Sequence, residues 1–271
     1  MAPFKNVMEI FKLLDKSNCR RCNEPTCLAF AAAVFQGRRR LAECPRLDSA
    51  LVERCSGHAP HAPSPEADFD QTIAPLRRRL KTVDLKTAAR RCGGRYDHGR
   101  LILKVMGKDV GVDANGRFYT DLHVHTWLAV PLLNYIIDGE GRPVSGRWVP
   151  FRELPGGQSW EGMFSQRCEK PLKAVADTYT DLFADMVALF GGSQTQKGCD
   201  ADIGVALYPL PKVPLLVCYW RPEDDLESDL HIFFDDSAAA NLNIESVYSL
   251  AAGLALMFEK LARRHGGVRV K

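Results

Sequence analysis

Residues 18–27 read NCRRCNEPTC and residues 43–45 read ECP, so four cysteines gather in one short segment of the chain. They are Cys19, Cys22, Cys27 and Cys44, with the spacing C-x2-C-x4-C-x16-C. Three thiolates on one tight loop can bind three corners of a cubane iron–sulfur cluster, and a fourth that returns after a helix can bind the last corner. The spacing therefore predicts one complete ligand set for a [4Fe-4S] cluster.

The residues around these cysteines predict short helices. Apolar residues recur at helical spacing over residues 4–14, and Ser17-Asn18 interrupts that helix just before the first cysteine. A second helix is expected over residues 27–36, with Gly37 at its end. Cys27 then begins a helix, where the positive end of the helix dipole favours a thiolate and an anionic cluster.

Structural zinc is the alternative interpretation, because four thiolates also form a tetrahedral zinc site. Zinc sites usually combine two C-x2-C pairs, whereas here a single pair is followed by an x4 spacing. The spacing therefore favours iron–sulfur over zinc, and four unconnected buried thiols remain a third interpretation.

Residues 13–45 resemble the small [4Fe-4S] module of the corrinoid iron–sulfur protein large subunit and of the B subunit of Rnf electron-transport complexes. The resemblance includes all four cysteines and the flanking residues Asn18, Glu24-Pro25-Thr26, Ala29-Phe30-Ala31 and Pro45. It implies a cluster used for low-potential electron transfer, and in the corrinoid protein for reductive reactivation of cobalt. It does not imply a corrinoid here, because the barrel and cobalamin domain of that protein have no counterpart in this sequence.

The composition is that of a globular protein: 271 residues, 46% hydrophobic and 25% charged. A net charge of only +3 gives no overall attraction to nucleic acid. No apolar stretch reaches the roughly 18–20 residues needed to cross a bilayer, and no signal peptide is recognisable, so we expect a cytoplasmic protein without a membrane span. In that reducing compartment nine cysteines indicate metal binding or redox chemistry rather than a disulfide framework.

Composition and periodicity divide the chain into a cluster module at residues 1–54, a Pro-rich linker at 55–70 and a larger domain at 71–271. Helices and strands do not alternate regularly in the larger domain, so the expected fold class is α+β, a small helical module linked to a mixed α+β domain. The expected helices cover residues 71–91, 122–138, 171–190 and 244–261, and the expected strands cover residues 101–105, 109–112, 203–207, 215–220 and 230–234.

The larger domain also carries a resemblance. Residues 149–157 read VPFRELPGG, residues 209–215 read PLPKVPL and residues 234–238 read FDDSA. They are similar to an uncharacterised family of anaerobe proteins, a domain of unknown function often appended to this iron–sulfur module, and the similarity covers most of residues 75–265. It implies no reaction, so whether the chain is an enzyme, and whether residues 71–271 hold a second cofactor, corrinoid or other, stay open.

Two histidines and one arginine are candidate site residues in the larger domain. His123 and His125 share a face if their segment is extended, and could then bind a metal or a cofactor, although polar residues at a helix start are the favoured interpretation. Arg152, with nearby backbone N–H groups, could meet an anion, but a turn with an internal ion pair is favoured.

Other groups of ligand-type residues give weaker signals. Cys55, His58 and His61 could hold a second metal, but chance placement in a flexible linker is favoured. The acidic run at residues 223–229 lacks the spacing of a calcium loop and is expected to be a solvated loop. Four further cysteines are too widely spaced for a second cluster: Cys92, Cys168, Cys199 and Cys218. Cys218 lies in an apolar strand and is expected to pack as a small hydrophobic residue.

Two functional hypotheses follow. In the first, the cluster passes single electrons to a cofactor or partner held by the larger domain. In the second, the protein is a non-catalytic ligand- or partner-binding protein in which the cluster is structural or sensory. Residues 1–54 carry ten Lys/Arg and six Asp/Glu, including Arg20, Arg21 and Arg38–Arg40 near the motif. These arginines either offset an anionic cluster or dock an acidic redox partner.

Overall fold

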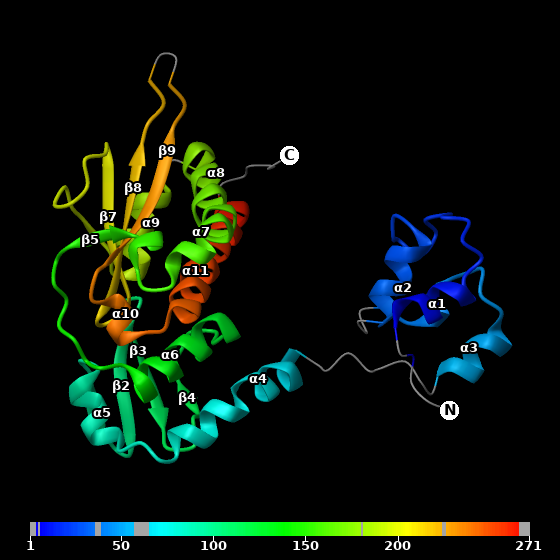
Figure 1. The fold of residues 1–271 in the computed structure, drawn as a ribbon, viewed down its shortest axis with the longest axis horizontal. Helices are drawn as coiled ribbons and strands as arrows, with labels where there is room; N and C mark the ends of the chain where they lie inside the picture. The colour runs from blue at the N-terminus through cyan, green and yellow to red at the C-terminus, as the bar shows by residue number, and fades with distance from the viewer. Residues whose placement is uncertain are drawn as a thin grey trace. The chain divides into compact units, whose positions relative to one another are not determined.

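A computed structural model describes residues 4, 6–35, 39–56, 65–179, 181–223 and 226–265 (Figure 1). The chain divides into two compact units, Met1–Asp70 and Gln71–Lys271. Each unit is described on its own below. Among the described helices, none combines the length and the apolar character needed to cross a bilayer.

Short helices make up the first unit. They are α1 (Val7–Leu13), α2 (Cys27–Phe35), a single 3-10 turn at Leu41–Glu43, and α3 (Ser49–Ser56). The side chain of Asn6 caps α1 by accepting the N–H of Glu9 at 3.1 Å. The predicted helices at residues 4–14 and 27–36 are therefore both present, whereas the proposed stop at Gly37 lies outside the described residues.

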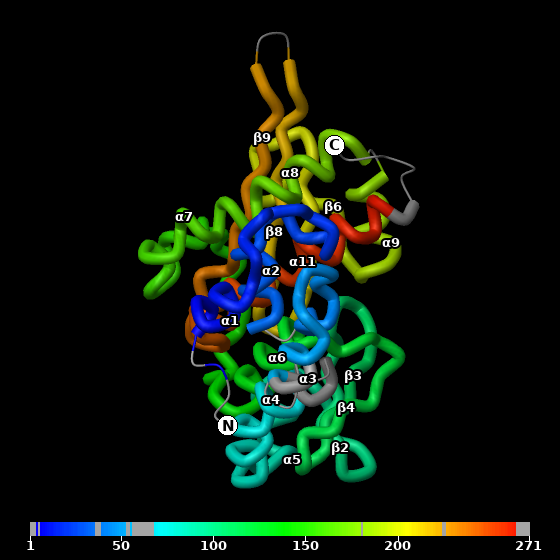
Figure 2. Tube along the Cα trace, turned by 90° about the vertical axis from the view of Figure 1, so that its right-hand side faces the viewer, coloured from blue at the N-terminus to red at the C-terminus, as the bar shows by residue number. Residues whose placement is uncertain are grey.

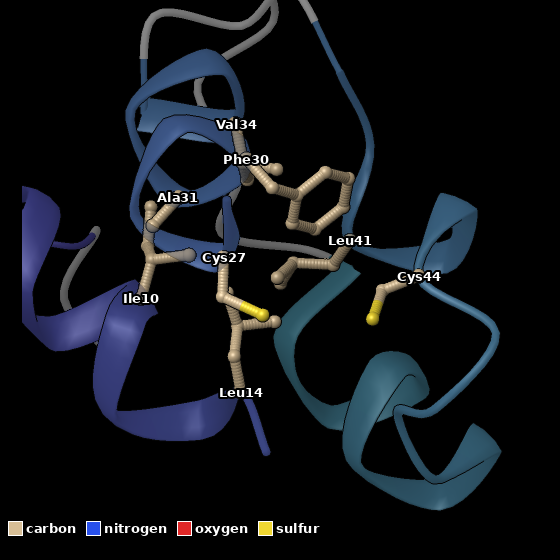
Figure 3. Close-up of a cluster of buried hydrophobic side chains, with 8 residues drawn as sticks. All are labelled: Ile10, Leu14, Cys27, Phe30, Ala31, Val34, Leu41 and Cys44. Atoms are coloured by element: carbon tan, nitrogen blue, oxygen red, sulfur yellow. The ribbon is translucent and has the colours of Figure 1, made fainter. Parts of the chain in front are cut away.

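One hydrophobic cluster fills the interior of the first unit (Figure 3). It joins α1, α2 and the turn at Leu41–Glu43, and its buried members are Ile10, Leu14, Cys27, Phe30, Ala31, Val34, Leu41 and Cys44. Burial in a common apolar cluster fixes the start of α2 relative to the segment that carries Cys44.

Helices extend into the predicted linker at residues 55–70 from both ends. Helix α3 continues to Ser56, and α4 (Pro65–Leu80) begins inside the predicted linker. Proline suits the first position of a helix, because that position needs no backbone N–H, so Pro65 starts α4 rather than interrupting a helix. Residues 57–64 lie outside the described part of the chain.

The second unit begins with a small antiparallel sheet. Its strands, in the order β1-β2-β3-β4, are Arg95–Asp97, Arg100–Val105, Lys108–Asp113 and Phe118–Tyr119. Helix α5 (Leu85–Arg91) lies beside β2 in both views of the molecule (Figures 1 and 2). Helix α6 (Thr126–Asp138) follows and starts four residues later than predicted, because residues 122–125 precede it as irregular backbone.

A second antiparallel sheet has the strand order β5-β9-β8-β7-β6. Its central strands β7 (Ile203–Leu210), β8 (Val213–Trp220) and β9 (Asp229–Asp235) match the three predicted apolar strands. The edges are β5 (Trp148–Pro150) and β6 (Ser193–Gln194). Because both sheets are antiparallel and the helices are separate from them, the α+β fold class is confirmed.

Helices cover one face of this larger sheet (Figure 1). The predicted helix at residues 171–190 is two helices, α8 (Lys170–Thr178) and α9 (Leu182–Phe190), and α9 ends at Gly191 in the left-handed conformation (φ 64°). Irregular turns and short helices precede α8: 3-10 turns at Phe151–Glu153 and Gly157–Trp160, α7 (Glu161–Phe164) and a π-helical turn at Ser165–Glu169. The chain closes with α10 (Ala238–Asn241) and α11 (Ile244–His265).

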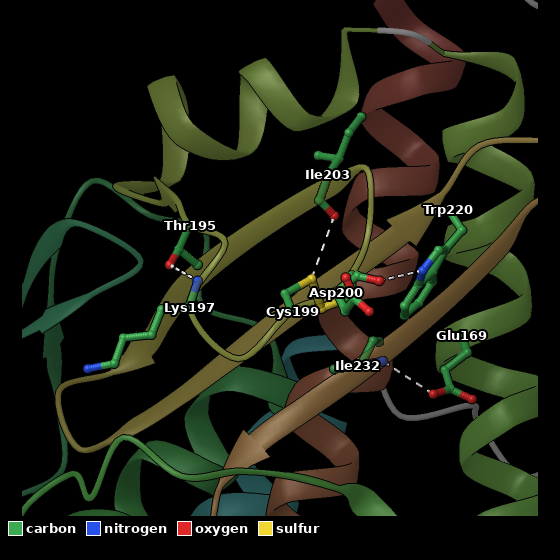
Figure 4. The surroundings of a disulfide bond; sticks show 9 residues. Glu169, Thr195, Lys197, Cys199, Asp200, Ile203, Trp220 and Ile232 are labelled. Atoms are coloured by element: carbon green, nitrogen blue, oxygen red, sulfur yellow. Dashed lines mark hydrogen bonds between the residues drawn. A yellow bond between two sulfur atoms is a disulfide. The ribbon is translucent and has the colours of Figure 1, made fainter.

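A disulfide between Cys199 and Cys218 links β8 to the segment before β7 (Figure 4). Gly204 of β7 makes this contact possible, because a Cβ there would lie 3.0 Å from the Cys199 sulfur and 2.2 Å from the Thr195 carbonyl oxygen. The expectation that Cys218 packs only as a small hydrophobic residue is therefore wrong. The residue is fully buried, as expected, but it is covalently paired.

Candidate metal centre

The loop between α1 and α2 has an unusual backbone. Lys16, Asn18, Arg20 and Asn23 all have positive φ, between 50° and 61°. Asparagine tolerates this left-handed region, but Lys and Arg rarely adopt it, and each such residue costs about 1–3 kcal/mol unless its surroundings compensate. The repeated reversal of the backbone winds the Cys19–Cys22 segment into a tight loop, as three neighbouring ligands of one cluster require.

Asn18 and Cys27 form a reciprocal pair across this loop. The Oδ1 of Asn18 accepts the backbone N–H of Cys27 at 2.8 Å, and the Asn18 backbone N–H donates to the Sγ of Cys27 at 3.4 Å. One asparagine thus binds both the backbone and the sulfur of the third cysteine. Hydrogen bonds to cysteine sulfur are one of the means by which proteins adjust cluster potentials.

Cys27 is the first residue of α2, as the sequence predicts. Thr26 precedes it, and the Thr26 hydroxyl oxygen accepts the N–H of Ala29 at 3.0 Å, which satisfies one of the free donors of the first turn. The positive end of the helix dipole lies next to the Cys27 sulfur, where it favours an anionic group such as a bound cluster.

Ion pairs tie the segment before Cys44 to the loop that carries Cys22 and Cys27. Arg39 contacts Glu24 at 3.5 Å and Glu43 at 3.0 Å, and the backbone N–H of Arg40 donates to Glu43 at 3.0 Å. The last of these hydrogen bonds, together with Arg39, lowers the pKa of Glu43. Cys44 itself follows the turn, and its N–H donates to the carbonyl of Leu41 at 3.1 Å.

A further ion pair connects the two ends of the motif. Arg46, two residues after Cys44, lies 3.0 Å from Asp15, four residues before Cys19. The pKa of Asp15 is lowered, first by hydrogen bonds from Ser17 and then by Arg46. Sequence reasoning missed this pair and the contacts of Arg39, because partners up to 31 positions apart leave no periodic signal in the sequence.

The four cysteines are free thiols and differ in exposure. Cys27 and Cys44 are each only 7% exposed, whereas Cys19 and Cys22 are partly buried. The backbone N–H of Arg21 lowers the pKa of Cys19, because it donates to the sulfur and stabilises the thiolate. Figure 3 shows the sulfur atoms of Cys27 and Cys44 directed into the same region beside Leu41.

Among the described residues, no three His, Cys, Asp or Glu side chains converge closely enough to hold one metal ion. In a cubane cluster each cysteine binds a different iron, so convergence on a single ion is not the arrangement that such a cluster needs. The donor set fits the cluster in other respects: four free thiols, two of them buried, with backbone N–H groups donating to the sulfurs of Cys19 and Cys27.

The sequence also suggested candidate site residues in the second unit. Among the described residues, none of them belongs to a group of ligands that could hold one metal ion. His123 and His125 lie just before α6, with His125 in extended backbone at its N-cap, and their rings meet edge to face with centroids 4.3 Å apart. Arg152 forms its ion pair with Glu161 at 3.2 Å. The expectation of an ion pair internal to the turn at residues 151–157 is therefore wrong, because the acidic partner, Glu161, lies beyond that turn.

The weaker candidates fall partly outside the described residues. Cys55 packs against the core of the first unit, but His58 and His61 lie outside the described residues. In the acidic run at 223–229, Asp224 and Asp225 are likewise outside them, and Glu223 forms an antiparallel bridge with Leu226. Cys92 and Cys168 are buried free thiols in the second unit, and burial raises the pKa of both.

Comparisons with known proteins support an iron–sulfur domain at the N-terminus. Residues 14–46 match a family model described as "Putative Fe-S cluster". Two curated relatives match over the same part of the chain. The acetyl-CoA decarbonylase/synthase complex subunit gamma of Methanocaldococcus jannaschii is 37% identical over 49 residues, 18% of this chain and 10% of the relative. The corrinoid/iron-sulfur protein large subunit of Moorella thermoacetica is 46% identical over 46 residues, 17% of this chain and 10% of the relative.

These matches confirm the resemblance to the corrinoid protein, but the similar segment spans only about a tenth of each of these relatives. No solved structure gives a significant match. Residues 84–257 match a second family model, which covers well over half of the chain and confirms the second resemblance. This protein therefore belongs to the family described as "Domain of unknown function (DUF3786)", with an iron–sulfur cluster domain preceding that domain.

Proposed function

We propose that Cys19, Cys22, Cys27 and Cys44 bind one [4Fe-4S] cluster and that the protein is a low-potential electron carrier. The reciprocal hydrogen bonds between Asn18 and Cys27 are the observation that carries the proposal, because they hold a free thiol at a helix N-terminus with an N–H directed at its sulfur. A cysteine that served only as a small core residue would need no such donor.

When bound, the cluster supplies reversible one-electron transfer. In the proposal, charged residues around the cysteines position the ligands and apolar residues exclude water. The ion pairs Arg39–Glu24 and Arg46–Asp15 hold the fourth ligand close to the first three. Phe30 and Leu41, both almost fully buried, exclude water from the side of Cys27 and Cys44. The electron acceptor in this proposal is a cofactor or partner held by residues 71–271.

The ligand assignment is tested by removing one thiolate at a time. Cys27→Ser should lose most of the iron and sulfide of the anaerobically prepared protein, because a hydroxyl is a poor ligand for iron compared with a thiolate. Cys55→Ser is the matched control, since Cys55 also packs against the core of this unit but lies outside the motif. Equal iron loss in the two variants would overturn the assignment.

Electron transfer is tested by voltammetry and by electron paramagnetic resonance during reductive titration. We expect a reversible one-electron wave at low potential and a paramagnetic reduced cluster. A cluster that is stable only when oxidised, and whose loss merely unfolds the first unit, would instead support the second hypothesis, in which the cluster is structural or sensory.

An acidic redox partner is part of the proposal. Arg20 and Arg21 on the ligand loop are exposed, and the side chain of Arg40 is 86% exposed, whereas Arg39 is engaged with Glu24 and Glu43. In this proposal the three exposed arginines supply positive charge near the motif. If they dock a partner, its association rate should fall steeply with ionic strength, because charge steering is screened beyond about 8 Å at physiological salt.

We also propose that the two units fold separately and that the protein is cytoplasmic. The cluster module at residues 1–54 buries too little surface to be secure alone, so cluster binding supplies much of its folding free energy. The four free thiols of the motif suit a reducing compartment, whereas the buried Cys199–Cys218 disulfide is uncommon in one. Iron removal should then abolish protease resistance of the first unit and leave the second intact, and loss of both would reject separate folding.

A further inference from the structure

The second unit contains a cavity of about 440 Å³ beside the start of α6. Its walls come from α6, α11, the end of α9 and the turn between β2 and β3. The volume is within the range of about 300–1,000 Å³ that is typical of small-molecule sites. The two histidines singled out by the sequence line this cavity, which the proposed electron carrier does not use.

The interior of the cavity is apolar and includes Trp127, Leu128 and Phe190. The indole of Trp127 lies directly against Gly253 of α11, where an added Cβ would come within 2.1 Å of the ring. Glycine therefore provides the space that the indole occupies against the helix. Leu256, about one turn further along α11, also lines the cavity and is 45% exposed, so apolar surface is open to an incoming molecule.

Three basic side chains line the same cavity: His123, His125 and Lys260. Apart from the edge contact between the two imidazoles, none of them has a hydrogen-bond or ion-pair partner among the described residues. The residues lining the cavity include no Asp or Glu. Burial, His123 and Lys260, in that order, lower the pKa of His125, as expected where positive charge is not balanced.

We propose that this cavity binds an apolar carboxylate, an aromatic or aliphatic small molecule whose carboxylate faces His123, His125 and Lys260 and whose ring or chain lies on Trp127. Neutral imidazoles each offer one N–H donor and the ammonium offers three, so the carboxylate oxygens have several donors. Helix α6 starts immediately after His125, and its positive end adds to the attraction. An apolar site with a few converging polar groups is the usual form of a small-molecule site.

The test measures calorimetric binding to the full-length, cluster-loaded protein with two probes of the same shape, naphthalene-2-carboxylate and the neutral naphthalene-2-carboxamide. We expect the carboxylate to bind at least about fivefold more tightly, because charge-assisted hydrogen bonds are stronger than neutral ones. Lys260→Gln should weaken carboxylate binding by about fivefold and leave amide binding unchanged. Lys86→Gln, an exposed lysine on α5 remote from the cavity lining, is the control and should change neither.

A second variant tests the apolar part of the site. Leu256→Trp should fill the cavity from an exposed position and weaken both probes, with circular dichroism checking that the unit stays folded. Equal affinity for the two probes, no binding of either, or an effect of Lys260→Gln no larger than that of Lys86→Gln would overturn the proposal. Cys27→Ser should leave the affinity for both probes unchanged, so the test of the cavity does not depend on whether the proposed cluster is present.

Discussion

The side-chain oxygen of Asn18 accepts the backbone N–H of Cys27 at 2.8 Å, and the backbone N–H of Asn18 donates to the Cys27 sulfur at 3.4 Å. This pair joins the loop that carries the first two cysteines to the helix that carries the third. It therefore fixes Cys27 relative to the loop of Cys19 and Cys22, which together are three of the four proposed cluster ligands.

Replacing Asn18 isolates this contact. Asn18→Ala removes the acceptor of the Cys27 N–H and should lower the free energy of unfolding of the cluster-loaded first unit by about 1–2 kcal/mol. Asn23→Ala is the control, because Asn23 has the same left-handed backbone but no side-chain hydrogen bond among the described residues. The measurement is cluster loss during anaerobic urea unfolding, and similar midpoints for both variants would mean that backbone strain alone matters.

The carboxylates that position Cys44 make the first unit sensitive to acid. The pKa values of Asp15 and Glu43 are lower in the folded protein than their ordinary values. The two carboxylates therefore contribute their full stabilisation when the pH is above their ordinary pKa values, and this stabilisation is lost as the pH falls through the lowered pKa values of the folded state. We expect the urea midpoint of the first unit to fall as the pH is lowered from 6 to 3. Glu43→Gln should flatten this dependence, and a variant that keeps the wild-type slope would contradict the assignment.

Gly204 should be intolerant of a side chain. A Cβ at this position would meet the Thr195 carbonyl oxygen at 2.2 Å and the Cys199 sulfur at 3.0 Å, so Gly204→Ala should destabilise the second unit by about 1–3 kcal/mol. Gly162→Ala is the matched control in helix α7, where an added Cβ meets nothing within 4 Å, and it should be neutral or slightly stabilising. Thermal unfolding of the two variants provides the comparison.

Local patterns in the sequence predicted many of the helices and strands. The start of α2 at Cys27 follows from helix-start residues, and strands β7, β8 and β9 follow from three apolar runs. The Cys199–Cys218 disulfide did not follow, because it depends on the register that pairs Gly204 with Cys218 and on the space left by that glycine. The Asp15–Arg46 pair was missed for a similar reason, since only the folded chain brings the two ends of the motif together.

The disulfide should stabilise the second unit. It closes a loop across a sequence separation of 19 residues, for which chain entropy predicts about 3 kcal/mol. Cys218→Ala should therefore lower the free energy of unfolding of non-reduced protein, and much of the difference should disappear when the wild type is reduced. Alkylation before and after reduction, followed by mass analysis, should show Cys199 and Cys218 protected together, and labelling of either in non-reduced folded protein would argue against the bond.

The most direct test of the central claim is a Mössbauer spectrum of anaerobic, iron-57-loaded full-length protein, taken with iron, sulfide and zinc analysis of the same sample. A single [4Fe-4S] cluster on Cys19, Cys22, Cys27 and Cys44 predicts about four irons and four sulfides per chain, with the spectrum of a cubane cluster. One zinc per chain, or about two irons with the spectrum of a two-iron cluster, would contradict the account.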